Sequence, residues 1–192
     1  MPSLQRVRRL YGLAVYCPNC GQLAPAQQFV ELIRMHREGL AALDALPADV
    51  KRGLAESGVL SANYENTIKD GFGALETYLK ARFETEAPHV TLRGKGNIFQ
   101  RLDEAADLYR KHLGVDIPGL LGHRQWEHLK QIAAMRHVLV HNAGIVDAKF
   151  LDRPPDWPQR AGQRLQIKRT DAGGFLDLLD RLPTAVAKPS PA

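Results

Sequence analysis

The stretch LSANYENTIKDGFGALETYLKARF, residues 60–83, decides the fold of this chain. Its apolar side chains recur at about every third or fourth position, which places them on one face of an α-helix. We therefore expect a long helix whose apolar side packs against other helices. Gly71 and Gly73 interrupt it, and they either weaken the helix or let another helix approach closely. The stripe consists of Tyr64, Ile68, Phe72, Leu75, Leu79 and Phe83.

Similar spacing predicts helices over about 26–46, 98–113 and 125–141. The second of these stops at Gly114 and the third at residues 142–144, since glycine is the usual residue just after a helix. The buried side of the third is expected to consist of Leu129, Ile132, Ala133 and Val140.

The last part of the chain is predicted from shorter patterns. Residues 145–151 form either a short helix or an extended segment, and residues 164–168 alternate polar and apolar, which favours a short edge strand. Thr170 or Asp171 caps a final helix that ends near Pro183.

The fold class that follows is all-α, an antiparallel helical bundle with a small N-terminal appendage. The expected division is an N-terminal segment with a helix (1–50), a helical domain (51–183) and a disordered tail (184–192).

The composition is that of a globular protein, with 44% hydrophobic and 24% charged residues among 192. Apolar runs such as residues 10–16 are too short to span a bilayer, and the first residues lack the apolar segment of a secretory signal. We therefore expect a cytoplasmic protein with no membrane partner. A net charge of +5 is compatible with a polyanionic partner.

One stretch carries most of the residues suited to chemistry. Arg136-His137-Val138-Leu139-Val140-His141-Asn142 closes the helix predicted over 125–141. Arginine offers a permanent planar cation suited to phosphate, and histidine exchanges protons near neutral pH. These groups supply what phosphodiester cleavage without a metal needs: stabilisation of charge and acid–base catalysis.

Helix geometry limits how these residues cooperate. Residues five apart are separated by about 140° around the axis, so Arg136 and His141 do not share a face of a regular helix. His137 and His141, four apart, do share one. Either the helix end at residues 142–144 lets His141 turn, or a second copy of the motif faces the first across a dimer.

The motif resembles the active-site signature of HEPN domains (higher eukaryotes and prokaryotes nucleotide-binding), in which an arginine, a polar residue, three further residues and a histidine end a helix of an α-helical bundle. Arg136 matches the arginine, His137 the polar position and His141 the histidine. The continuation at residues 142–147 and the helices upstream are also similar, so that the resemblance covers about residues 60–182.

The resemblance implies a metal-independent endoribonuclease of the toxin–antitoxin, abortive-infection or defence type, acting on RNA as a homodimer. His141 would be the acid–base residue, Arg136 would hold the scissile phosphate and His137 would assist, with Asn142 as a fourth candidate catalytic residue. No cofactor is expected for catalysis, and an antitoxin protein is an expected partner. Some relatives have lost catalysis, so the alternative is an inactive HEPN-like module that binds RNA or protein.

Two other interpretations of the motif need no catalysis. Arg136 could be a solvated residue, with His137 and His141 as cations that complement the negative end of the helix dipole. The two histidines also have the spacing of a metal-binding pair, but neither the glutamate of a metalloprotease motif nor a third ligand is evident.

Outside the motif, Cys17 and Cys20 with the glycine that follows resemble one knuckle of a zinc ribbon. A closed zinc site needs four ligands, and the chain has no second cysteine pair. The sequence therefore predicts an incomplete zinc site, either metal-free or completed by a second protomer around a structural zinc. Arg93 and Lys95, in a glycine-rich loop, are candidate contacts for RNA phosphates or belong to a solvated connector.

Overall fold

The computed structural model describes residues 25–92, 96–152 and 159–186. These residues form eight α-helices and one 3-10 turn without a strand, which confirms the predicted all-α helical bundle. None of these helices is long and apolar enough to cross a membrane. The elements are α2 (Pro25–Asp44), α3 (Ala48–Glu56), α4 (Val59–Glu86), η1 (Ile98–Gln100), α5 (Leu102–Leu113), α6 (Ile117–Leu121), α7 (His123–His141), α8 (Ala148–Leu151) and α9 (Arg169–Val186).

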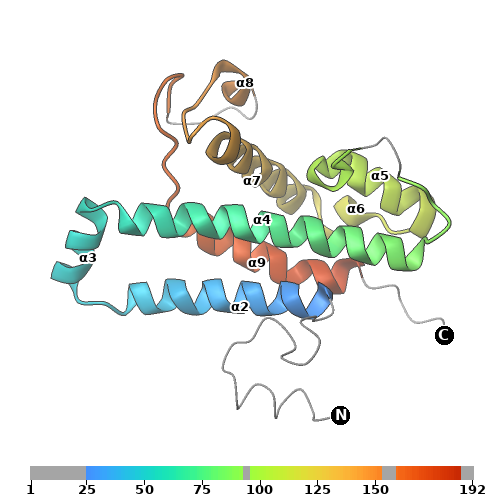
Figure 1. Ribbon diagram of the computed structural model, residues 1–192, viewed down its shortest axis with the longest axis horizontal. Coiled ribbons are helices and arrows are strands. Elements are labelled where there is room, and N and C mark those ends of the chain that lie inside the picture. The colour runs from blue at the N-terminus through green and yellow to red at the C-terminus, as the bar shows by residue number, and fades with distance from the viewer. Residues whose placement is uncertain (1–24, 93–95, 153–158, 187–192) are drawn as a thin grey trace, which may run out of the picture.

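The long helix α4 is the centre of the bundle, with α2 running antiparallel to it and α9 packed against both (Figure 1). The predicted stripe of α4 is buried from Ile68 to Phe83, while Tyr64 packs at the edge of the core. Gly71 lies where α9 crosses, because a Cβ there would sit 2.8 Å from a ring atom of Phe175. The predicted close approach of a second helix is therefore found at Gly71, whereas Gly73 has nothing within 4 Å.

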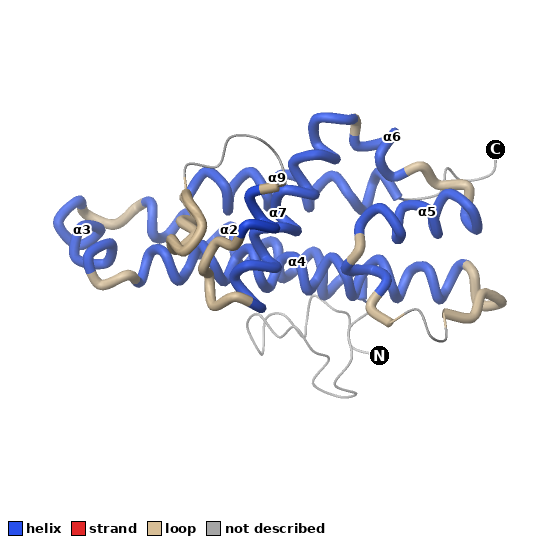
Figure 2. Tube along the Cα trace, turned by 90° about the horizontal axis from the view of Figure 1, so that it is seen from above, coloured by secondary structure: helices blue, strands red, loops and turns tan. Residues whose placement is uncertain are grey.

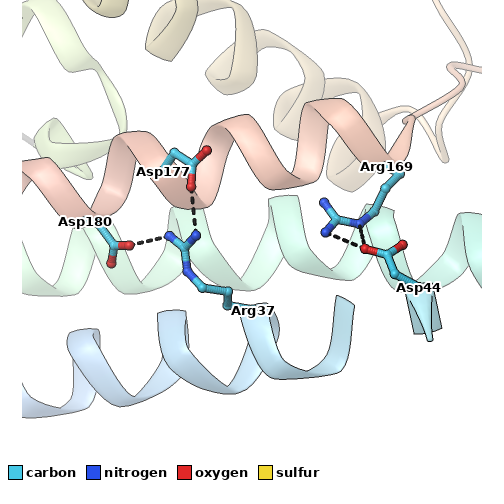
Figure 3. A network of polar contacts seen from close by, with 5 residues as sticks. All are labelled: Arg37, Asp44, Arg169, Asp177 and Asp180. Carbon is cyan, nitrogen blue, oxygen red and sulfur yellow. Dashed lines mark hydrogen bonds and ion pairs between the residues drawn. The ribbon is translucent and has the colours of Figure 1, made fainter. Parts of the chain in front are cut away.

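Helix α2 contributes to this core, although we expected its residues to belong to an N-terminal segment (1–50). Phe29, Ile33 and Leu40 are almost completely buried. On the outside, α2 is joined to α9 by ion pairs (Figure 3). Arg37 bonds to the carboxylates of Asp177 and Asp180, and Arg169 bonds to Asp44 at the far end of α2.

The other helices extend the bundle at both ends. Helix α3 projects beyond one end of α4, and the short helices α5 and α6 lie toward the other (Figure 2). Helix α7 packs across α4 and also contacts α9. This arrangement places the Arg136–Asn142 stretch beside the middle of the bundle, at the end of α7.

Several local predictions were wrong. Helix α3 was not predicted, because it is only nine residues long and buries none of them. Helix α6 was expected as loop, yet Pro118 lies in its first turn, where proline is well tolerated. The helix predicted over 98–113 breaks at Arg101, whose backbone is extended. Residues 164–168 form no strand, only a single bridge between Arg164 and Ile145.

The ends of α7 and α9 also differ from expectation in detail. Val140 was expected on the buried side of α7 but is 44% exposed, whereas Val138 is buried. The side chain of Asp171 accepts a hydrogen bond from the Lys168 N–H at 2.8 Å, so it does help to cap α9. That helix continues past Pro183 to Val186, and residues 187–192 lie outside the described part of the chain.

Candidate functional site

The orientation of α7 follows from its buried residues. Leu129, Ile132, Met135 and Val138 recur at helical spacing and face the core. Arg136 follows Met135 directly, so it lies at the flank of this buried face and reaches the cavity beside α4 and α5. The apolar pattern of α7 therefore decides which polar side chain of the motif points into the molecule.

Arg136 is half-buried and unpaired. Its Cζ atom lies 5.9 Å from the centre of the Phe72 ring on α4, within the range of a cation–π contact. Its Nε atom is buried without a hydrogen-bond partner, and the guanidinium has no hydrogen bond or ion pair in the described part of the chain. No carboxylate of the described residues neutralises this guanidinium, so its charge would attract an anion that enters the cavity.

The guanidinium lines a cavity of about 610 Å³ between α7 and the start of α5. Phe72 contributes to its wall from α4, and Arg136 and His137 contribute to it from α7. This volume lies within the range of sites that hold small organic ligands. The cavity is thus larger than a single phosphate group requires.

The charges around the cavity balance. The lining cations are Arg101, Lys130 and Arg136, and the lining carboxylates are Asp103, Glu104 and Glu127. Glu104 is paired with Arg101 at 2.5 Å, and Glu127 is paired with Lys130 at 2.8 Å. In the described part of the chain, Arg136 is the cation at this cavity that is left without an ion pair.

The two motif histidines lie against each other at the exposed end of α7. The ring centres of His137 and His141 are 4.8 Å apart, with 44° between the ring planes. This contact confirms that the two histidines share a helix face. His137 lines the cavity, but His141 is not among its lining residues. Within one copy, the structure therefore brings Arg136 and His137 together and leaves His141 beyond them.

Asn142 serves the turn that follows α7. Its Nδ2 donates to Asp147 Oδ2 at 2.6 Å, and Asp147 in turn accepts from the Phe150 N–H at 2.8 Å as the N-cap of α8. The hydrogen bond from the Phe150 N–H lowers the pKa of Asp147 most. The hydrogen bond from Asn142 and the nearby charge of His137 lower it further. The amide of Asn142 is thus held by a structural carboxylate.

Other candidate residues are placed differently. Cys17, Cys20, Arg93 and Lys95 lie outside the described residues. Within the residues that the structure describes, no group of three or more His, Cys, Asp or Glu side chains is arranged to hold a metal ion. Sequence reasoning did not assign Phe72 to the site, because its position in the stripe indicated only that it belongs to the core.

Comparison with known proteins provides no family assignment. The chain matches no protein-family model, no curated protein and no solved structure at a significant level.

Proposed function

We propose that this protein is a metal-independent endoribonuclease that cleaves RNA by attack of a ribose 2′-hydroxyl on the adjacent phosphate. The observation that carries the proposal is the unpaired guanidinium of Arg136, which lines a cavity together with His137, whose ring contacts His141. A cation next to two groups that exchange protons near neutral pH is what this reaction requires.

The proposed roles follow from the chemistry of each side chain. His141 removes the proton of the 2′-hydroxyl, whose oxygen then attacks phosphorus, and the bond from phosphorus to the 5′-oxygen breaks. A protonated imidazole, that of His137 or of His141 in a second copy, gives its proton to the leaving oxygen. Arg136 binds the phosphate and stabilises the charge that develops on it. The products are a 2′,3′-cyclic phosphate and a 5′-hydroxyl, and no cofactor takes part.

The proposal includes a homodimer. His141 lies beside the cavity of Arg136 but does not line it, so two copies facing each other through the ends of α7 would complete the set of groups. The exposure of Val140 and Ile145, at 44% and 41%, supports a contact at this end of the helix. The family resemblance further suggests a cytoplasmic toxin–antitoxin or defence setting, with an antitoxin as partner.

The alternative is a non-catalytic module of the same fold that binds RNA or protein. Two observations favour it. The lining charges of the cavity balance, which weakens attraction to a polyanion, and the Asn142 amide is engaged with Asp147.

RNA cleavage in EDTA tests the proposal. We expect the purified protein to cut RNA and leave 2′,3′-cyclic phosphate ends, and we expect Arg136→Ala and His141→Ala to lower the rate by at least about 100-fold. Arg124→Ala and His89→Ala are matched controls, since both side chains are exposed and lie outside the cavity. RNA binding without cleavage would favour the non-catalytic module, and cleavage that survives both motif substitutions would exclude the proposed roles.

A further inference from the structure

Arg164 joins three parts of the molecule that lie far apart in sequence. Its Nη2 atom donates to both carboxylate oxygens of Glu65 on α4, at 2.8 and 3.0 Å. Its Nη1 atom donates to the Ala143 carbonyl at 3.3 Å, just after the end of α7. The guanidinium also packs against Gly144, where a Cβ would lie 3.3 Å from Nη1. We call Glu65 and Arg164 the latch.

The latch acts on a turn whose backbone is already tightly bonded. The N–H groups of Asn142 and Gly144 both donate to the Val138 carbonyl at 3.0 Å, which closes the last turn of α7. Ala143 has a positive φ of 50°, an uncommon conformation for a residue other than glycine. The Gly144 carbonyl accepts from the Leu165 N–H at 2.8 Å, beside the latch.

Glu65, the partner of Arg164 on α4, is buried at this contact. Glu65 is only 8% exposed although it carries a carboxylate. A buried charge without a partner is strongly destabilising. The folded state therefore favours the position of Arg164 in which its guanidinium pairs with Glu65. The side chain of Arg164 is 59% exposed. Because the same guanidinium also donates to the Ala143 carbonyl, its fixed position restrains the end of α7. Helix ends otherwise fray readily.

We infer that Glu65 and Arg164 are positioning residues of the candidate site, fixing the end of α7 so that His141 keeps its contact with His137. The inference rests on the proposed function for its catalytic consequence. Neither residue touches the cavity of Arg136, so each acts only through the turn at residues 142–144. The latch keeps α7 regular through His141, and this favours two facing copies over a helix end that lets His141 turn inward.

The test compares wild-type protein with Arg164→Gln, Glu65→Gln and Arg164→Lys. Arg164→Gln is the main variant because it changes the exposed partner. Arg164→Lys keeps the charge but lacks the fork that reaches Glu65 and Ala143 together. The control is Arg169→Ala, which breaks the ion pair between Arg169 of α9 and Asp44, whose side chain is 50% exposed where that of Glu65 is only 11% exposed.

Two readouts are measured on each variant. For RNA cleavage, we expect Arg164→Gln to lower kcat roughly tenfold or more with KM nearly unchanged, because a small displacement of a catalytic group is costly. We expect Arg164→Lys to recover part of the rate. By NMR, we expect weaker nuclear Overhauser contacts between the rings of His137 and His141, and faster amide exchange at Gly144 and Leu165. Arg169→Ala changes none of these quantities.

The two proposals can fail separately. If the wild-type protein cleaves no RNA, the NMR readout still tests the latch. Unchanged ring contacts and unchanged exchange in Arg164→Gln and Glu65→Gln would overturn the inference while leaving the ribonuclease proposal intact. An unchanged or higher kcat in a variant that loosens the turn would also overturn it, because His141 would then work better without the constraint.

Discussion

The guanidinium of Arg136 lies over the ring of Phe72, with 5.9 Å between its Cζ atom and the ring centre. This contact holds the cation from its apolar side and leaves its N–H groups without an ion pair in the described part of the chain. An aromatic ring stabilises a cation without neutralising it. The charge therefore remains available to an anion that enters the cavity.

Inorganic phosphate should stabilise the wild-type protein through this cation. At ten times its Kd, a ligand of the folded state adds about 1.4 kcal/mol to the free energy of unfolding, which raises Tm by a few degrees. We expect Arg136→Ala to abolish this increase and the exposed Arg124→Ala to keep it. Differential scanning calorimetry measures the shift. An equal shift in Arg136→Ala would mean that phosphate binds elsewhere.

The turn after α7 should become more stable when its strained residue is replaced by glycine. Ala143 adopts a positive φ of 50°, which costs a residue with a Cβ roughly 1–2 kcal/mol. Glycine adopts this conformation freely but loses more entropy on folding, so we expect Ala143→Gly to add about 0.5–1 kcal/mol to the free energy of unfolding. Urea denaturation measures it.

The opposite change at the next residue is the control for this prediction. Gly144 also has a positive φ, of 78°, and a Cβ there would lie 3.3 Å from Arg164 Nη1. Gly144→Ala should therefore destabilise the protein by at least about 1 kcal/mol. A loss of stability in Ala143→Gly would contradict the strain assigned to the turn.

Stability should fall as the pH drops below about 6.5, in part because of His36. Burial lowers the pKa of His36, and the charge of Asp70, 3.6 Å from its Nε2, opposes this only partly. The unfolded chain therefore binds a proton at a pH where the folded protein does not, and stability is lost until the pH reaches the folded-state pKa.

His36→Gln removes this contribution while keeping a polar group near Thr67, whose hydroxyl lies 3.3 Å from His36 Nδ1. We expect a flatter dependence of the free energy of unfolding on pH below about 6.5. The exposed His89→Gln should leave the wild-type dependence almost unchanged. Identical curves for the two variants would show that another group causes the loss.

Helix α2 should be held by its apolar residues much more than by the ion pairs of Figure 3. Leu40 is 1% exposed, so Leu40→Ala should lower the free energy of unfolding by about 2–5 kcal/mol. Arg37 is half-exposed in its pairs with Asp177 and Asp180, and Arg37→Ala should cost less than about 1 kcal/mol. Chemical denaturation compares the two, and a larger effect at Arg37 would reverse this ranking.

The long helices could be predicted because the spacing of their apolar residues indicates which side is buried. The stripe of α4 is found almost as expected, and so is the stop of α5 at Gly114, whose φ is 69°. Short elements contain too few residues to show such a pattern clearly. Helix α3 buries nothing, and Val140 continues the apolar pattern of α7 although the structure leaves it exposed.

The candidate site could be predicted only at the level of single residues. Helical spacing correctly separated Arg136 from His141 and joined His137 to His141. The environment of Arg136 depends on Phe72, 64 positions earlier in the chain, and the latch joins Glu65 to Arg164 across 99 positions. Such contacts between distant segments leave no periodic signal in one sequence.

The backbone bonds beside the latch have a consequence for how much this region can vary in length. Main-chain hydrogen bonds of 2.8 and 2.9 Å join Val146 to Gly162 and Gln163, so they close the loop that contains α8. Doubling the length of a loop closed in this way costs only about 0.6 kcal/mol in entropy. An inserted peptide tag or second domain would therefore be tolerated after the exposed Asp152, because Phe150 would stay in the core and Asp147 would keep its hydrogen bond with Asn142.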